Sequence, residues 1–132
     1  MSHVTGPLLL YVEDEPLILD LGVTSLEDAG FAVTAIPSGE SAIAALDAGG
    51  EIKALITDID LGGAVSGWDV AKHARELFPE MPVIYVSGGS SNEWASMGVP
   101  GSVMLVKPYA SAQLVVAVSS AMLGPDGQPK GG

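Results

Sequence analysis

Residues 8–15 read Leu-Leu-Leu-Tyr-Val-Glu-Asp-Glu, and this stretch decides the fold class. Its apolar part, Leu8–Val12, is short and continuous, which favours a β-strand buried on both faces. Three acidic residues follow at once, and Pro16 then suits the first turn of a helix. A buried strand that leads directly into a helix is typical of a βα unit.

The same alternation continues along the chain. Gly30 is predicted to end the first helix, Ser38 to cap the second, and Ser66 with Asp69 to form a capping box on the third. Ser90–Met97 reads as a weak fourth helix. Five βα units predict an α/β fold, a parallel sheet with helices on both faces. The predicted strands are Leu8–Val12, Phe31–Ile36, Ala54–Thr57, Pro82–Val86 and Ser102–Val106.

Composition narrows the class of protein. The 132 residues are 48% hydrophobic and contain no cysteine, which excludes general disorder, disulfides and cysteine-based zinc sites. A net charge of −11 argues against direct binding to nucleic acid or to an anionic membrane. No apolar run reaches the roughly 18 residues of a membrane span, and residues 1–7 do not resemble a secretory signal. We therefore expect a soluble, cytoplasmic protein.

The expected organisation is one domain over residues 8–123, between a flexible start (1–7) and a disordered tail (124–132). Met1 and the tail favour a chain that was not cut from a larger protein. No second domain for DNA binding or catalysis is expected in it.

Polar side chains gather where the predicted strands end. In open parallel sheets, ligands bind beyond the carboxyl ends of the strands. These ends carry Glu13 and Asp14, then Asp58, then Ser87, and finally Lys107. Three converging carboxylates repel one another. At an effective dielectric constant of about 20, each close pair costs on the order of a few kcal/mol. Lys107 and a divalent cation would balance that charge.

The ligand types identify the cation and a reaction. Carboxylates without histidine or cysteine favour Mg²⁺ or Mn²⁺. A carboxylate beside such a cation and a lysine can attack phosphorus and form an aspartyl-phosphate. The Ser87 hydroxyl can bind a phosphoryl oxygen, and Gly88 and Gly89 leave room beside it.

Taken together, the chain resembles the receiver domain of bacterial two-component response regulators, of the stand-alone type, from about Leu8 to Leu123. Each motif is weak alone, but all occur in order at the expected strand ends. The matching pieces are Val12-Glu-Asp-Glu15, Thr57-Asp-Ile-Asp-Leu61, Gly67, Val86-Ser-Gly88 and Lys107-Pro-Tyr109.

The resemblance implies a role for each site residue. Asp58 would be the phosphorylation site and also a Mg²⁺ ligand. Asp14 would be a direct Mg²⁺ ligand, Glu13 a ligand mostly through water, and the Asp60 backbone carbonyl a further ligand. Ser87, Gly88 and Lys107 would form the phosphoryl-binding site. The family fold is flavodoxin-like and doubly wound, with strand order 2-1-3-4-5, and it usually has a cis peptide before the proline that matches Pro108.

The resemblance also implies partners. The phosphoryl donor would be a sensor histidine kinase or a phosphotransfer protein. The signal would leave through the face of helix four, strand five and helix five to a downstream protein, with phosphorylation shifting a two-state equilibrium. A monomer or weak dimer is expected.

Three positions depart from the family. Met104 stands at the position of the frequent aromatic switch residue, so any switch here would use another side chain. Asp60 adds a carboxylate two residues after Asp58, which would alter access of water to the acyl-phosphate. The stretch 61–67 lacks a proline that many members have, which predicts a more mobile loop.

Other functions fit less well. Asp58 and Asp60 resemble the Asp-x-Asp pair of haloacid-dehalogenase-type phosphatases, but that pair normally sits on the first strand and is joined by a later acidic pair. A flavin carrier would need a glycine-rich phosphate loop where Glu13–Glu15 stand. A phosphate sink or shuttle remains a variant of the receiver hypothesis. His73 is expected at the surface and Trp68 and Trp94 in packing, with Trp94 also a candidate for partner contact.

Overall fold

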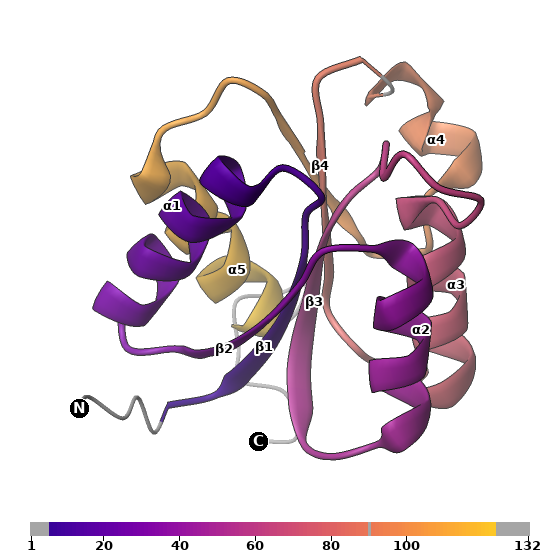
Figure 1. Cartoon of the computed structure of the whole chain (residues 1–132), viewed down its shortest axis with the longest axis horizontal. Coiled ribbons are helices and arrows are strands. Elements are labelled where there is room, and N and C mark those ends of the chain that lie inside the picture. The colour runs from indigo at the N-terminus through magenta and orange to yellow at the C-terminus, as the bar shows by residue number, and fades with distance from the viewer. Residues whose placement is uncertain (1–5, 90, 124–132) are drawn as a thin grey trace.

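A five-stranded parallel sheet of order β2-β1-β3-β4-β5 forms the centre of the structure (Figure 1). The structure is a computed structural model, and it describes residues 6–89 and 91–123. The predicted fold class and strand order are therefore confirmed. The predictions for the two chain ends fall largely on residues outside this description. The strands are β1 Leu8–Val12, β2 Ala32–Ile36, β3 Ile52–Asp58, β4 Val83–Ser87 and β5 Val103–Val106.

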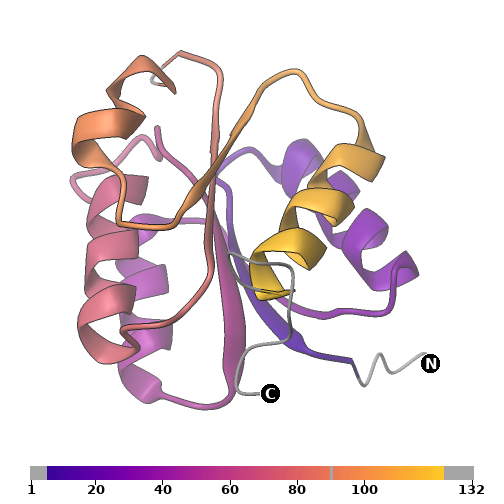
Figure 2. The same cartoon turned by 180° about the vertical axis from the view of Figure 1, so that it is seen from behind.

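Helices cover both faces of the sheet (Figures 1 and 2). On one face lie α1 (Pro16–Asp28) and α5 (Ser111–Leu123), and on the other lie α2 (Gly39–Ala48), α3 (Gly67–Leu77) and α4 (Trp94–Met97). Each face buries its own apolar cluster, so every central strand is covered on both sides. Among the described residues, no helix has the length and apolar character needed to cross a bilayer.

The predicted caps are confirmed. The Ser38 side chain accepts from Ser41 N–H at 3.1 Å. Ser66 and Asp69 form both hydrogen bonds of a capping box. Gly30 follows the last turn of α1 with φ of 102°, a conformation that favours glycine. These local features set where α2 and α3 begin and where α1 ends.

One predicted segment differs from the structure. The weak helix expected at Ser90–Met97 is a 3₁₀ turn at Ser91–Glu93 followed by the single turn of α4. A segment so short lacks enough apolar contact to extend a helix.

Tyr11 and Gly22 fit one another across the β1–α1 contact. Tyr11 is 1% exposed, and a Cβ atom built on Gly22 would lie 2.5 Å from its hydroxyl oxygen. The ring belongs to the buried cluster on this face of the sheet, so moving it away from Gly22 would disturb that packing. Glycine at position 22 is therefore required by the tyrosine and not by helix geometry.

We expect Gly22→Ala to destabilise the protein by roughly 1 to 2 kcal/mol, since the overlap with Tyr11 outweighs the better helix propensity of alanine. In a Tyr11→Val background the overlap is gone, so the same Gly22→Ala change is expected to stabilise. Urea denaturation of the four proteins measures this reversal of sign. A destabilising effect of equal size in both backgrounds would contradict it.

Candidate functional site

Three carboxylates meet at the carboxyl edge of the sheet. Oxygen atoms of Glu13, Asp14 and Asp58 lie within 4.8 Å of one another. Glu13 and Asp58 are buried at 1% and 5% exposure, whereas Asp14 is exposed. The parallel pairing of β1 with β3 places the two strand ends side by side, which explains why residues 44 positions apart in sequence converge (58 less 14).

Lys107 joins this cluster from the end of β5. Its Nζ lies 3.1 Å from Asp58 Oδ2 and 3.3 Å from Glu13 Oε1. Lys107 N–H also donates to Ser87 O at 2.8 Å, which continues the β4–β5 ladder and aligns the lysine. Burial alone would lower the lysine pKa, but the hydrogen bond and charge of Asp58, together with Glu13, raise it overall. The amine is therefore held as a cation between two acids.

The surroundings of Glu13 disfavour the ionised form of its carboxyl group. Burial raises its pKa to about 7, and the Asp58 charge acts in the same direction, although Glu15 N–H and Lys107 oppose the shift. Glu15 N–H donates to Glu13 Oε2 at 3.1 Å. A carboxyl so far from water gains most from a further positive charge, so this edge favours a cation.

Asp58 is oriented by its neighbours along the chain. Asp60 N–H donates to Asp58 Oδ1 at 3.3 Å, and Thr57 Oγ1 donates to Asp58 O at 2.8 Å. One carboxylate oxygen thus contacts a backbone amide and the other contacts Lys107. In the following loop, Gly62 has φ of 69°, and a Cβ there would lie 3.1 Å from Asp14 Oδ2. The backbone of that loop passes close to the acidic edge.

Ser87 ends β4 beside Lys107, and Gly88 follows it. Ser87 is buried, and its Oγ accepts from Gly89 N–H at 3.2 Å. A methyl group at Gly88 would lie 3.9 Å from Lys107 Cβ, an ordinary contact, so the structure shows no steric need for glycine there. The Lys107–Pro108 peptide bond is cis. Met104 pairs with Tyr85 in the β4–β5 register, and Tyr85 lies two residues before Ser87 on β4.

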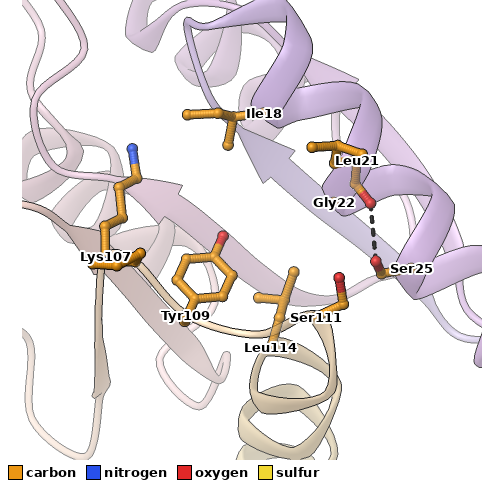
Figure 3. Close-up of a pocket in the computed structure, with 9 residues that line it drawn as sticks. Ile18, Leu21, Gly22, Ser25, Lys107, Tyr109, Ser111 and Leu114 are labelled. Atoms are coloured by element: carbon orange, nitrogen blue, oxygen red, sulfur yellow. Dashed lines mark hydrogen bonds between the residues drawn. The ribbon is translucent and has the colours of Figure 1, made fainter.

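A pocket that the sequence did not predict adjoins Lys107. It holds about 270 Å³ between α1 and the segment that leads from Lys107 into α5. Figure 3 shows Ile18, Leu21 and Gly22 of α1 on one side and Tyr109 and Leu114 on the other. Leu17 and Leu21 are 71% and 61% exposed, and these apolar residues on the outer side of α1 were the available signal for a surface here.

The remaining polar and aromatic candidates lie elsewhere. His73 is half-buried on α3 and its Nε2 contacts Asp47 Oδ1 of α2 at 2.6 Å, so it bridges two helices. Trp68 is buried at 5% exposure, as expected of a packing residue, whereas Trp94 is 37% exposed on α4.

The donor set fits Mg²⁺ or Mn²⁺. Carboxylate and carbonyl oxygens are hard ligands, and neither histidine nor cysteine accompanies them in the cluster. Glu13 Oε1 is buried and, apart from the Lys107 amine 3.3 Å away, forms no hydrogen bond. A cation would supply the charge that this oxygen lacks.

Comparison with known proteins agrees with this geometry. The model of the response regulator receiver domain matches residues 9–119. A response regulator receiver protein from Sinorhizobium medicae WSM419 is 44% identical, with a TM-score of 0.87 over 91% of this chain and 97% of that one. A receiver domain protein from Clostridium thermocellum is 25% identical, with a TM-score of 0.79 over 88% and 94% of the two chains.

Curated relatives are longer proteins. The transcriptional regulatory protein TcrA of Mycobacterium tuberculosis is 30% identical over 110 residues, which are 82% of this chain and 43% of TcrA. The response regulator SaeR of Staphylococcus aureus is 27% identical over 114 residues, 85% of this chain and 49% of SaeR. The chain therefore spans less than half the length of either relative.

Proposed function

Because the chain belongs to the response regulator receiver family of two-component systems, we propose that it is a signalling switch controlled by phosphorylation of Asp58. The observation that carries this proposal is the approach of Lys107 Nζ to Asp58 and Glu13, at 3.1 and 3.3 Å, beside the exposed carboxylate of Asp14. This arrangement offers a nucleophilic carboxylate, a fixed cation and a place for a second cation within one edge of the sheet.

Each residue has a part in the proposed transfer. Asp14, Asp58 and the carbonyl of Asp60 would hold Mg²⁺ directly, and Glu13 mostly through water. The bound cation would supply charge stabilisation to the phosphoryl oxygens. An Asp58 oxygen forms the new bond to phosphorus while the bond from phosphorus to the donor imidazole nitrogen breaks. Lys107 and Ser87 bind phosphoryl oxygens, and the released imidazole takes up a proton from water.

The donor is proposed to be a sensor histidine kinase or a phosphotransfer protein that docks on α1. The exposed side chain of Leu21 lines the pocket beside Lys107, and Leu17, four residues earlier on α1, is also exposed, so a partner helix placed there would bring an imidazole to the acidic edge. The chain's net charge of −11 favours a partner with basic residues around its apolar contact and argues against direct output to DNA.

The test is labelling by a small phosphoryl donor. Incubation with acetyl phosphate and Mg²⁺ is expected to add one phosphoryl group per chain, and chelation of Mg²⁺ is expected to prevent it. Lys107→Ala should fold but label roughly 10- to 100-fold more slowly, since a preorganised cation is lost. Intact-protein mass spectrometry follows the product and circular dichroism the fold. Equal labelling with and without Mg²⁺, or by Lys107→Ala at the wild-type rate, would refute the proposed site.

A further inference from the structure

Tyr85 links the segment around α4 to the centre of the sheet. It is fully buried on β4, and Val99 N–H donates to its hydroxyl at 3.0 Å. Ser102 Oγ donates to Val99 O at 2.6 Å, and Trp94 Nε1 donates to Ser102 Oγ at 2.9 Å. These bonds order the segment from α4 to the start of β5, which we call the α4 turn (residues 94–102).

A second set of contacts connects Tyr85 with the proposed phosphorylation site at Asp58. The Trp68 ring lies against the Tyr85 ring, with centroids 4.8 Å apart and planes tilted by 59°. Trp68 follows Gly67, which packs so closely that a Cβ on Gly67 would lie 2.2 Å from Asp58 O. Gly67 N–H donates to Ile59 O at 2.9 Å. The first turn of α3 is thus fixed to the backbone that carries Asp58.

We propose that Tyr85 is a positioning residue that couples the state of Asp58 to the α4 turn. The path runs from the Asp58 backbone to Gly67, which precedes Trp68 in the chain, then from the Trp68 ring to the Tyr85 ring, and then through the hydrogen bonds that end at Trp94. This coupling rests on the proposed phosphorylation of Asp58.

Two observations support β4 as the element that carries the coupling. Met104, the neighbour of Tyr85 in the β4–β5 register, is aliphatic, and no aromatic residue occurs in β5. The path also ends at an exposed surface, because Trp94 and Met97 are 37% and 36% exposed. A shift of the α3 start would reach that surface because close-packed rings transmit displacement instead of absorbing it.

The variant Tyr85→Phe isolates the hydroxyl. It keeps the ring contact with Trp68 and removes only the acceptor for Val99 N–H. The α4 turn is expected to stay folded, because Arg75 also donates from α3 to Met81 O and Pro100 O, both at 2.7 Å. Loss of response in this variant would therefore report coupling and not unfolding of the turn.

The experiment uses the two tryptophan indole N–H signals in nuclear magnetic resonance spectra of the full chain, with beryllofluoride and Mg²⁺ as the probe. In the wild type, loading is expected to shift the indole signals of both Trp68 and Trp94. In Tyr85→Phe, the Trp68 signal and the backbone amides of residues 57–59 should still shift. The change at Trp94 should fall roughly threefold or more.

Ser96→Ala is the matched control, since it removes a hydroxyl of the same turn that donates to Glu93 O, off the path. It should keep the full Trp94 response. A full Trp94 response in Tyr85→Phe, an equal loss in Ser96→Ala, or failure of Tyr85→Phe alone to bind beryllofluoride would each overturn the coupling role. Failure of the wild type to bind beryllofluoride would instead refute the proposed function.

Discussion

Asp58→Asn is expected to lose all labelling by acetyl phosphate while the protein stays folded. The amide keeps the shape of the carboxyl group, and its single oxygen can still accept one of the two hydrogen bonds that Asp60 N–H and Lys107 Nζ donate to the aspartate. It cannot act as the nucleophile, and it is a poorer ligand for a hard cation. Mass spectrometry after incubation with acetyl phosphate and Mg²⁺ should show the unmodified mass alone.

Asp60→Asn is the matched control for this experiment. Asp60 is exposed, and its backbone amide, which the substitution retains, makes the contact with Asp58. We expect Asp60→Asn to be labelled at about the initial rate of the wild type. Labelling of Asp58→Asn would move the phosphorylation site elsewhere. Loss of labelling in Asp60→Asn, with turnover of a phosphomonoester by the wild type, would favour the Asp-x-Asp phosphatase hypothesis.

The convergence of the site could be predicted because it follows from topology alone. Parallel strands that alternate with helices bring their carboxyl ends to one edge, so the residues after each apolar run become neighbours. Glu13, Asp58 and Lys107 meet in the structure for this reason. The caps at Ser38 and Ser66 were equally predictable, because their hydrogen bonds are local.

Contacts that depend on side-chain packing could not be predicted. The fit of Gly22 to Tyr11 joins a strand to a helix, and the hydrogen bond from Val99 to Tyr85 spans 14 residues. No periodicity of the sequence marks either pair. The fourth helix was predicted too long because its weak pattern carries no apolar face that would set its ends. Burial, and with it the state of Glu13, also becomes visible only in the structure.

Glu13→Gln is expected to stabilise the metal-free protein at pH 8 by roughly 1 to 3 kcal/mol, because the wild-type side chain must then be ionised while buried. Glutamine keeps an oxygen acceptor for Glu15 N–H and leaves the ion pair between Lys107 and Asp58 in place. Chemical denaturation in the presence of a chelator measures the gain. The same substitution removes a carboxylate from the proposed cation site, so Mg²⁺ should stabilise the variant much less than the wild type.

The pH dependence gives the sign of the Glu13 effect. Burial raises the folded-state pKa of Glu13 from 4.5 to about 7. Below pH 4.5 the carboxyl is protonated in both the folded and the unfolded chain, and its contribution to stability is complete. That contribution is lost as the pH rises toward 7, because the unfolded chain releases the proton first. The advantage of Glu13→Gln should therefore be near zero at pH 4.5 and largest above pH 7. Glu15→Gln, at an exposed acid two residues away, should show no such rise, and an equal rise there would assign the effect to net charge instead of burial.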